Sequence, residues 1–409
     1  MFGYLSKAMD SMTREGVDAL RAGVEDFKDD VSSGVMSLAD SPSRVRSLLT
    51  RQMDDALARH DSHMVNQLLD NAMANHLMGP QAPSIIRSAA QQQAKRQLRD
   101  AIDSADSKRL KGALVAAKRL NATELPEFTE AIEKYKAIRK LPVGWDVNLM
   151  VLNREGARMV AQLQLDDPSV CARFQRLLDL THRKVYTRDR MGQPVPERLR
   201  LLTVAAVTND ESWGNYAARR EAIRREIDAD ISGYTRYDVD TMARSSDAES
   251  DAGESAESIA LALADEDFAS PLMQEVNEVF LFHGTSAANA EKIKTHDFRI
   301  NLAGSNAGSL YGRGIYLAEN CTKSDEYTSP LADGVRHLLV CRVALGRVHY
   351  TDAKEDADPR GCEDACLKGK YHSILGDRKK CRGTFREFVV FDEEQTYVNY
   401  ILTYRREDP

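Results

Sequence analysis

The chain has 409 residues, of which 42% are apolar and 29% are charged, as is typical of a soluble globular protein with two or three domains. The net charge of −7 argues against a dedicated nucleic-acid-binding protein, because such proteins present a basic surface. Six cysteines are too few for a disulfide scaffold in so long a chain, and no run of about 20 apolar residues predicts a membrane span.

Residues 1–140 are predicted to be helical almost throughout. Apolar residues recur mostly at steps of three and four, the pattern of an amphipathic helix, in Met9, Met12, Leu20, Val24 and Phe27. Acidic and basic residues are interspersed, which favours a helical scaffold that contacts partners or inhibits the rest of the chain. Residues 1–16 contain no apolar core of signal-peptide length, so we expect an intracellular protein, in the nucleus or the cytoplasm.

Two segments of this helical region look alike at an offset of 45 residues. Ala56-Leu57-Ala-Arg-His-Asp61 resembles Ala101-Ile102-Asp-Ser-Ala-Asp106, and apolar residues follow both segments at matching positions. This similarity is consistent with a duplicated helical hairpin that has Asp61 and Asp106 in its turns. Because there are only two copies, coincidence is also a fair interpretation.

The segment Leu141-Pro142-Val-Gly144-Trp145 interrupts the helical pattern, since proline and glycine terminate helices. Helical spacing of apolar residues returns between residues 155 and 183. We therefore predict a helical connector over residues 141–195, which ends at the turn Gly192-Gln-Pro194-Val-Pro196.

Residues 196–409 have a different pattern, in which short apolar runs are separated by turn residues. These runs predict strands at 198–207, 279–282, 337–345, 388–391 and 397–404. Helices are expected only at 213–227 and at 286–296, and residues 244–268 are predicted to form a flexible acidic insertion. Because the strands do not alternate with helices, we predict an α+β domain with a mostly antiparallel sheet.

Three short motifs in this region contain residue types that bind ligands and take part in catalysis. His283-Gly284-Thr285 follows a predicted strand, Tyr316 ends Tyr311-Gly-Arg-Gly314-Ile-Tyr316, and Glu387 lies at the start of another strand. Each motif alone is weak evidence, because such a histidine is usually structural, such a tyrosine buried and such a glutamate solvated. No Gly-x-Gly-x-x-Gly opens a strand–helix unit, which argues against a dehydrogenase.

Together and in this order, the motifs resemble the catalytic domain of the poly(ADP-ribose) polymerase family, in which His, Tyr and Glu stand on three separate strands. The resemblance covers residues 196–409. It includes Trp213-Gly-Asn-Tyr216, which is similar to a Trp-x-x-Tyr helix in one branch of the family. It implies an ADP-ribosyltransferase fold with a split antiparallel sheet, preceded here by the all-helical region, and it implies NAD⁺ as a substrate.

The resemblance also implies roles for the residues that bind NAD⁺. The His283 side chain would hydrogen-bond the adenine-side ribose. The Gly284 backbone and the Ser324 hydroxyl would hold the nicotinamide amide, since glycine allows a ligand to approach the main chain closely. Tyr316 and Tyr327 would enclose the nicotinamide ring, because aromatic faces attract a flat cation.

Thr285 of the histidine motif and Arg299 complete the expected NAD⁺ contacts. Arg299 matches an arginine at the start of the family's donor loop, which would comprise residues 303–312 here. Glu387 matches the catalytic residue that stabilises an oxocarbenium-like ribose and orients the acceptor. Lys323 lies where the family often has an active-site lysine, although an ordinary solvated lysine is about as good an interpretation.

The resemblance therefore implies a pentosyltransferase that moves ADP-ribose from NAD⁺ to a protein, itself included, or to a nucleic acid. Glu387 permits poly-ADP-ribosylation but does not distinguish it from the transfer of single units. A catalytically silent NAD⁺-binding scaffold and an NAD⁺ glycohydrolase are the alternative functions. We expect no metal, although Cys362, Cys366, His372 and Cys381 make up a zinc set of non-standard spacing.

Overall fold

The structure of the chain is a computed structural model. It describes residues 42–74, 78, 82–142, 145–152, 154–155, 158–242, 271–300, 310–353 and 358–407. The described residues form two compact units: a helical unit within Met1–Asp103 and Val115–Thr129, and a sheet unit within Ser104–Leu114 and Glu130–Pro409. The acidic insertion expected at 244–268 and most of the expected donor loop lie outside the described residues.

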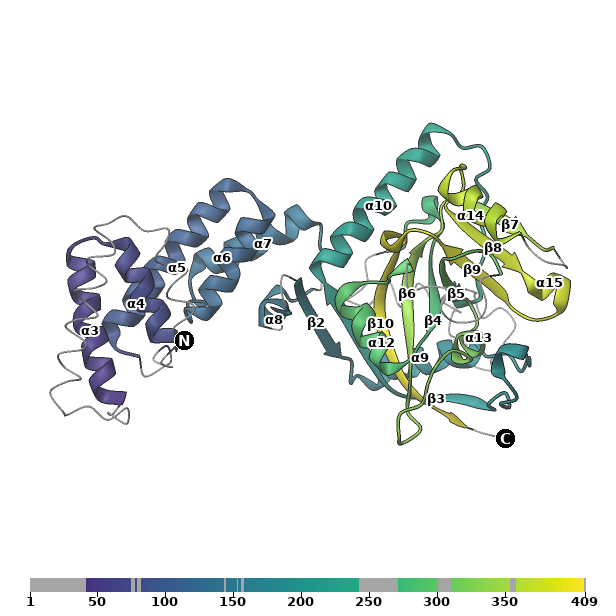
Figure 1. The fold of residues 1–409 in the computed structure, drawn as a ribbon, viewed down its shortest axis with the longest axis horizontal. Coiled ribbons are helices and arrows are strands. Elements are labelled where there is room, and N and C mark those ends of the chain that lie inside the picture. Colours follow the sequence, from purple (N-terminus) through teal and green to yellow (C-terminus); the bar gives the residue numbers. More distant parts are fainter. Residues whose placement is uncertain are drawn as a thin grey trace, which may run out of the picture. The chain divides into compact units, whose positions relative to one another are not determined.

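The described part of the N-terminal region is helical, as predicted (Figure 1). Its helices are α3 (Pro42–Ala58), α4 (Ser62–Ala74), α5 (Ser84–Ser104), α6 (Ser107–Arg119) and α7 (Pro126–Arg139). Small and aliphatic side chains such as Ala90, Ala94 and Leu98 of α5 are buried, so the helices pack closely through one face.

The turns that follow α3 and α5 have the same local geometry. The backbone reverses at a left-handed residue in both, His60 with φ 55° and Ala105 with φ 49°. The next residue, Asp61 or Asp106, then accepts a hydrogen bond from the backbone N–H three positions later, at 2.9 and 2.8 Å. These aspartates cap the second helix of each pair. The matched turns support the hypothesis of a duplicated helical hairpin, which stays a prediction.

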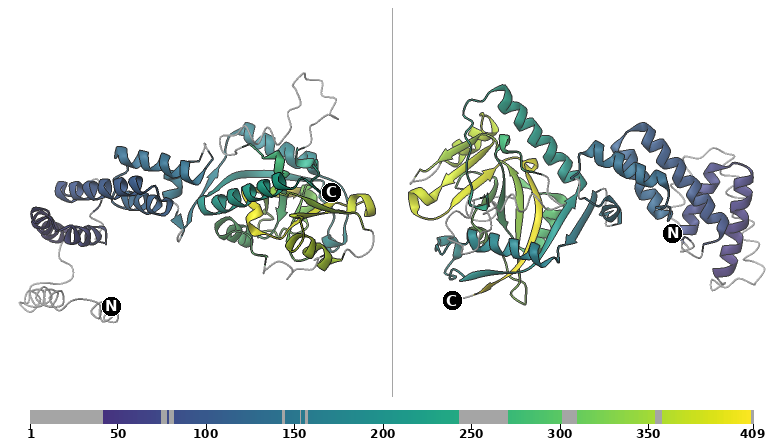
Figure 2. Two further views of the ribbon diagram at one scale, coloured as in Figure 1. Left: turned by 90° about the horizontal axis from the view of Figure 1, so that it is seen from above. Right: turned by 180° about the vertical axis from the view of Figure 1, so that it is seen from behind.

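The sheet unit is built on a mixed, mostly antiparallel sheet, which confirms the predicted α+β class. The strand order is β1-β2-β3-β10-β6-β4-β5-β9-β8-β7, and among the described strands only β7 and β8 run parallel. The strands are β1 (Arg154–Glu155), β2 (Arg158–Gln164), β3 (Arg198–Asn209), β4 (Glu278–Gly284), β5 (Ile315–Ala318), β6 (Arg336–Ala344), β7 (Val348–Thr351), β8 (Ser373–Asp377), β9 (Arg386–Val390) and β10 (Thr396–Glu407). Figure 2 shows the sheet from two further sides.

Helices pack on both faces of this sheet. They are α8 (Val147–Leu152), α9 (Pro168–Thr181), α10 (Asp210–Ala229), α12 (Ala287–His296), α13 (Cys321–Asp325), α14 (Pro359–Leu367) and α15 (Arg378–Arg382). Side chains alternate between the faces along each strand. On β4, Phe280 and Phe282 therefore join the core formed with α9, whereas Val279 and Leu281 join the core formed with α12.

Two sequence-based expectations about this unit were wrong. Residues 158–164, expected to be helical, form β2 and pair with β3 in a register from Val160↔Asn209 to Gln164↔Ala205. The connector is therefore part of the sheet unit, and the ordered sheet begins well before residue 196. Helices α13, α14 and α15 were also missed, because each is shorter than the roughly ten residues over which helical periodicity can be recognised.

The first residue of α10 anchors parts of α6 and α7 within the sheet unit. The Asp210 carboxylate accepts hydrogen bonds from Lys111 Nζ at 2.8 Å and from the Tyr135 hydroxyl. Arg139 Nη2 donates to the Asp210 carbonyl at 2.7 Å. A Cβ atom at Gly214 would come within 2.2 Å of the same Arg139 nitrogen, so glycine there lets the arginine approach the helix.

The sheet is nearly divided between β4 and β5. These strands pair at Phe282↔Ala318, whereas β4 pairs with β6 along its whole length. We call this junction the seam; the half-sheet β1-β2-β3-β10-β6-β4 lies on one side of it and β5-β9-β8-β7 on the other. The expected split sheet is thus present. Among the described residues, every helix is too short or too polar to cross a membrane.

Candidate active site

The three motif residues meet at the seam. His283 lies near the end of β4, Tyr316 on β5 and Glu387 on β9. His283 Nδ1 is 2.9 Å from the Tyr316 carbonyl oxygen across the seam, and Glu387 is the register partner of Ala318, two residues from Tyr316. A break in the pairing of the sheet thus places side chains from three strands next to one another.

The protonation of His283 follows from its surroundings. A carbonyl oxygen only accepts, so the nitrogen that faces the Tyr316 carbonyl, Nδ1, carries the proton. Burial lowers the pKa of His283, which keeps the ring neutral at neutral pH. Nε2 of this tautomer is a hydrogen-bond acceptor suited to a ligand hydroxyl. The ring is also held edge-on by Phe298, at 5.0 Å between centroids.

Gly284 and Ser324, the two expected contacts of the nicotinamide amide, are in direct contact. A Cβ atom on Gly284 would lie 1.6 Å from the Ser324 carbonyl oxygen, so the close approach of β4 and α13 requires glycine here. The buried Ser324 hydroxyl donates to the Phe282 carbonyl at 2.9 Å. Its lone pairs stay available to accept a hydrogen bond from an amide N–H.

Tyr316 is tied to the preceding loop. Its hydroxyl accepts a hydrogen bond from the Tyr311 N–H at 2.9 Å and donates to the Gly312 carbonyl at 2.8 Å. Burial, followed by the charge of Glu387, raises the pKa of Tyr311 to about 12 and also raises that of Tyr316. Both phenols are therefore neutral, and Tyr316 presents a ring held in a fixed orientation.

Lys323 of α13 links Glu387 to a second group of polar residues. Its ammonium donates to Asp189 at 2.7 Å, to Glu326 at 3.0 Å and to the Tyr327 hydroxyl at 3.0 Å, and it lies 3.4 Å from Glu387 Oε1. Burial alone would lower the pKa of Lys323, but Glu387 and the other three groups outweigh burial and raise it. Lys323 is 5% exposed in its side chain, so it is a buried cation of the site and not a solvated lysine.

The remaining expected residues lie around this centre. Thr285 is buried directly after β4, and Tyr327 is 43% exposed beside Lys323. Arg299 is exposed and follows Phe298, the residue whose ring touches His283. Of the expected donor loop, residues 310–312 are described, and they include the Gly312 that binds Tyr316.

Asp189 is a member of the site that the sequence did not reveal. It belongs to no motif, and its contacts with Lys323 and Tyr327 join residues 134 and 138 positions apart. Contacts of this separation leave no periodic or motif signal in a single sequence. Only the fold brings the residues together.

The zinc alternative gains no support from the described residues, which contain no group of three or more potential metal ligands. Cys362 of α14 packs in an apolar cluster with Tyr311 and Ile374. The His372 ring is engaged on both sides: Nδ1 accepts from the Arg347 N–H at 2.9 Å, and Nε2 lies 2.8 Å from Glu226.

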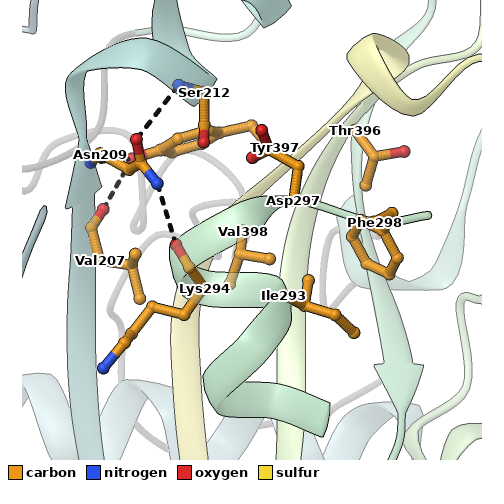
Figure 3. Close-up of a pocket in the computed structure, with 10 residues that line it drawn as sticks. All are labelled: Val207, Asn209, Ser212, Ile293, Lys294, Asp297, Phe298, Thr396, Tyr397 and Val398. Atoms are coloured by element: carbon orange, nitrogen blue, oxygen red, sulfur yellow. Dashed lines mark hydrogen bonds between the residues drawn. The ribbon is translucent and has the colours of Figure 1, made fainter. Parts of the chain in front are cut away.

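A small cavity lies beside the site, between α10, α12 and β10 (Figure 3). Its lining residues are Val207, Asn209, Ser212, Ile293, Lys294, Asp297, Phe298, Thr396, Tyr397 and Val398. Phe298 is shared between this cavity and the contact with His283. His283, Tyr316 and Glu387 do not line it.

The split antiparallel sheet, with a histidine, a tyrosine and a glutamate at its seam, has the arrangement expected from the resemblance to the catalytic domain of poly(ADP-ribose) polymerases. A family model of the poly(ADP-ribose) polymerase catalytic domain matches residues 183–406. The chain therefore belongs to the poly(ADP-ribose) polymerase family. The matched region begins before residue 196, which agrees with the inclusion of earlier segments in the sheet unit.

Three curated relatives show similarity over shorter stretches. The chain is 41% identical over 83 residues to the poly [ADP-ribose] polymerase tankyrase of Caenorhabditis elegans, which is 20% of this chain and 4% of that protein. It is 30% identical over 142 residues to human protein mono-ADP-ribosyltransferase PARP14, 32% of this chain and 7% of that protein. It is 26% identical over 152 residues to mouse protein mono-ADP-ribosyltransferase PARP11, 32% of this chain and 43% of that protein. The chain thus spans less than half the length of each relative.

Proposed function

We propose that the sheet unit binds NAD⁺, cleaves the bond between nicotinamide and ribose, and transfers ADP-ribose to a protein acceptor. The observation that carries the proposal is the meeting of His283, Tyr316 and Glu387 at the seam. Membership of the poly(ADP-ribose) polymerase family supports it independently.

In the proposed complex, His283 Nε2 accepts a hydrogen bond from a hydroxyl of the adenine-side ribose. The Gly284 backbone and the Ser324 hydroxyl bind the nicotinamide amide, and the rings of Tyr316 and Tyr327 lie against the two faces of the nicotinamide. A cation between aromatic faces gains about 0.5–2 kcal/mol. Thr285 and Arg299 make further contacts with NAD⁺.

Glu387 performs the bond-breaking role. Departure of nicotinamide leaves positive charge on the ribose, and a carboxylate beside the 2′-hydroxyl stabilises that charge. The same carboxylate orients the attacking acceptor or accepts its proton. Because a glutamate stands at this position, the triad permits poly-ADP-ribosylation. One relative is named a poly [ADP-ribose] polymerase and two are named mono-ADP-ribosyltransferases, so the relatives do not decide between polymer formation and the transfer of single units.

The test is incubation with labelled NAD⁺, with measurement of released nicotinamide and of label on protein. Glu387→Gln keeps the size of the side chain but removes its charge, so we expect the turnover number to fall by about 10²- to 10⁴-fold while NAD⁺ still binds. Failure of the wild type to exceed this variant would support a catalytically silent scaffold. Free ADP-ribose without labelled protein would support a glycohydrolase.

The length of the product is read from the intact mass of the acceptor after NAD⁺ treatment. A ladder of ADP-ribose units shows polymer formation, and one unit per site shows mono-transfer. Label on added RNA or DNA would identify a nucleic-acid acceptor. An intracellular location and a partner-binding or inhibitory role of the helical unit stay predictions.

A further inference from the structure

Asp189 belongs to a segment, residues 183–190, that holds α13 in place. Arg190 follows Asp189 in the 3₁₀ turn Arg188–Arg190 and is fully buried. Its guanidinium donates to Asp325 at 3.2 Å and to the Thr322 carbonyl at 2.8 Å, so two residues of α13 are bound directly. The backbone on which Asp189 stands is therefore fixed relative to Lys323 and Ser324, which lie on the same helix.

A single oxygen of Asp189 binds two groups of the candidate site. Oδ2 accepts from Lys323 Nζ at 2.7 Å and from the Tyr327 hydroxyl at 2.7 Å. The Asp189 side chain is 32% exposed, whereas that of Lys323 is 5% exposed, so the carboxylate stands at the outer side of the site. The same Asp189 oxygen therefore holds the Lys323 ammonium and orients the Tyr327 ring.

The hydrogen bonds of Lys323 determine what Glu387 receives from it. An ammonium has three N–H groups, and here they are directed to Asp189, Glu326 and the Tyr327 hydroxyl. Glu387, at 3.4 Å, is near the positive charge but receives no donated proton among these hydrogen bonds. The Glu387 oxygens stay available to accept hydrogen bonds from a ligand.

We propose that Asp189 is a positioning residue for NAD⁺ binding and turnover, an inference that rests on the proposed function. Its carboxylate fixes the Tyr327 ring against the nicotinamide through the hydroxyl. It also holds one N–H of Lys323 that would otherwise turn toward Glu387. Without Asp189, the Tyr327 hydroxyl is left with Lys323 as its hydrogen-bond partner, so the ring is held less firmly. Lys323 also closes onto Glu387 and occupies the oxygens that the ribose needs.

The test compares Asp189→Ala, Asp189→Asn, Tyr327→Phe and the double variant Asp189→Ala/Tyr327→Phe. Both the dissociation constant of NAD⁺, by calorimetry, and the rate of nicotinamide release are measured. We expect Asp189→Ala to weaken NAD⁺ binding about three- to tenfold and to lower the turnover number by a similar factor. Tyr327→Phe weakens binding comparably but lowers turnover less, because the charge on Asp189 remains.

Asp189→Asn separates the two effects. The amide oxygen still accepts from the Tyr327 hydroxyl, so binding stays within about twofold of the wild type. A neutral amide holds the Lys323 ammonium more weakly than a carboxylate does, so Lys323 shifts toward Glu387 and turnover falls. In the double variant, binding is no weaker than in the worse single variant, because both changes remove the same interaction. Asp179→Asn is the matched control: it removes a carboxylate whose partner, Arg198 at 2.7 Å, is on the surface.

Several results would overturn the inference. One is an Asp189→Ala variant that binds NAD⁺ and turns over as the wild type does. Another is a double variant whose loss of NAD⁺ affinity equals the product of the losses in the two single variants. If Asp189→Ala melts below the assay temperature, Asp189→Asn decides, and an unchanged turnover number in that variant contradicts the proposal. If the wild type binds NAD⁺ without releasing nicotinamide, the proposed function fails. The NAD⁺ dissociation constants of the single and double variants then test the role of Asp189 by themselves.

Discussion

Individual residues at the seam differ in how strictly the fold specifies them. His283 is oriented by one hydrogen bond and one ring contact, and Tyr316 by two hydrogen bonds to the loop before it. Gly284 is constrained by backbone contact alone, because a Cβ atom would lie 1.6 Å from the Ser324 carbonyl oxygen. Backbone atoms cannot rotate away as a side chain can, so this position tolerates substitution least.

Gly284→Ala tests this constraint. The added methyl group forces β4 and α13 apart, so we expect NAD⁺ affinity to fall more than about tenfold and the melting temperature to fall by about 2–10 °C. Calorimetry and thermal melting measure the two effects. Gly112→Ala in α6 is the control, since a Cβ atom there meets nothing within 4 Å. NAD⁺ affinity equal to that of the wild type in Gly284→Ala would contradict the placement of the amide site.

The motif residues of the site could be predicted because each lies in a short local pattern. His283, Tyr316 and Glu387 each stand in or beside an apolar strand, and their order along the chain is distinctive. The environment of Lys323 could not be predicted, because its partner Asp189 comes from a segment without a motif. Sequence thus indicates candidate side chains for the site, and the fold shows what surrounds them.

At the scale of single elements, α10 joins β4 and β6 through a buried group of charges. Glu278 Oε1 accepts from the Tyr216 hydroxyl at 2.6 Å and from Arg220 at 2.9 Å, and it lies 3.5 Å from Arg342. The side chains of Glu278 and Arg342 are fully buried. Tyr216 belongs to the Trp-x-x-Tyr motif, so the motif attaches this helix to the strand that carries His283.

Replacing Glu278 with alanine would remove the buried carboxylate that lies against Arg220 and Arg342. We expect Glu278→Ala to destabilise the sheet unit by about 3–5 kcal/mol, because removing one partner of a buried ion pair is costly. Urea unfolding, followed by tryptophan fluorescence, measures the change. Glu221→Ala on the same helix is the control: its pair with Arg224 is 38% exposed on both sides, and such pairs contribute about 0–1 kcal/mol. Similar unfolding midpoints for the two variants would contradict the buried-charge argument.

Strands were easier to predict than short helices and edge segments. Runs such as residues 279–282 are continuously apolar because both faces of β4 are buried, and this pattern is visible in the sequence. β2 was mistaken for a helix because three of its apolar residues also fit helical spacing, and pairing with β3 decided its conformation. α13, which carries Lys323 and Ser324, has five residues and no recognisable period.

On the scale of the whole molecule, the two units can be followed separately in solution. Both tryptophans of the chain, Trp145 and Trp213, lie in the sheet unit, with their rings 5.7 Å apart. Tryptophan fluorescence therefore reports the unfolding of the sheet unit, whereas far-ultraviolet circular dichroism, which measures helix content, reports the unfolding of both units.

The sheet unit should lose stability as the pH falls below about 6.5. Burial lowers the pKa of four histidines in it, His182, His283, His337 and His372. Their pKa values are lower in the folded state than in the unfolded state, so the unfolded state binds more protons in this range. The contribution of these histidines to the free energy of unfolding is therefore fully present above their unfolded-state pKa. It is lost as the pH drops through their lower folded-state pKa values.

The measurement is the urea midpoint of tryptophan fluorescence at pH 7.5 and at pH 5.5. We expect a lower midpoint at pH 5.5. Most carboxyl groups titrate near about pH 4, so they contribute little between these two values. Burial raises the pKa of Glu326 and Glu394, so their protonation opposes part of the loss. His372→Gln, which removes one of the four buried histidines, should show a smaller change with pH than the wild type. Equal midpoints at the two pH values would show that the histidines are not buried in their neutral form.

The order of strands has a consequence for how the protein is made. β10 follows every other described strand along the chain, yet it lies between β3 and β6 in the middle of the sheet (Figures 1 and 2). Its pairing with β3 joins residues as far apart as Arg198 and Glu407, 209 positions along the chain. Before β10 is synthesised, the nascent chain therefore lacks the strand that joins β3 to β6. Both β3 and β6 are then sheet edges with unpaired backbone groups. Such edges pair readily with other chains, and closing them over long sequence separations is slow, so the nascent sheet unit should depend on chaperones until β10 emerges.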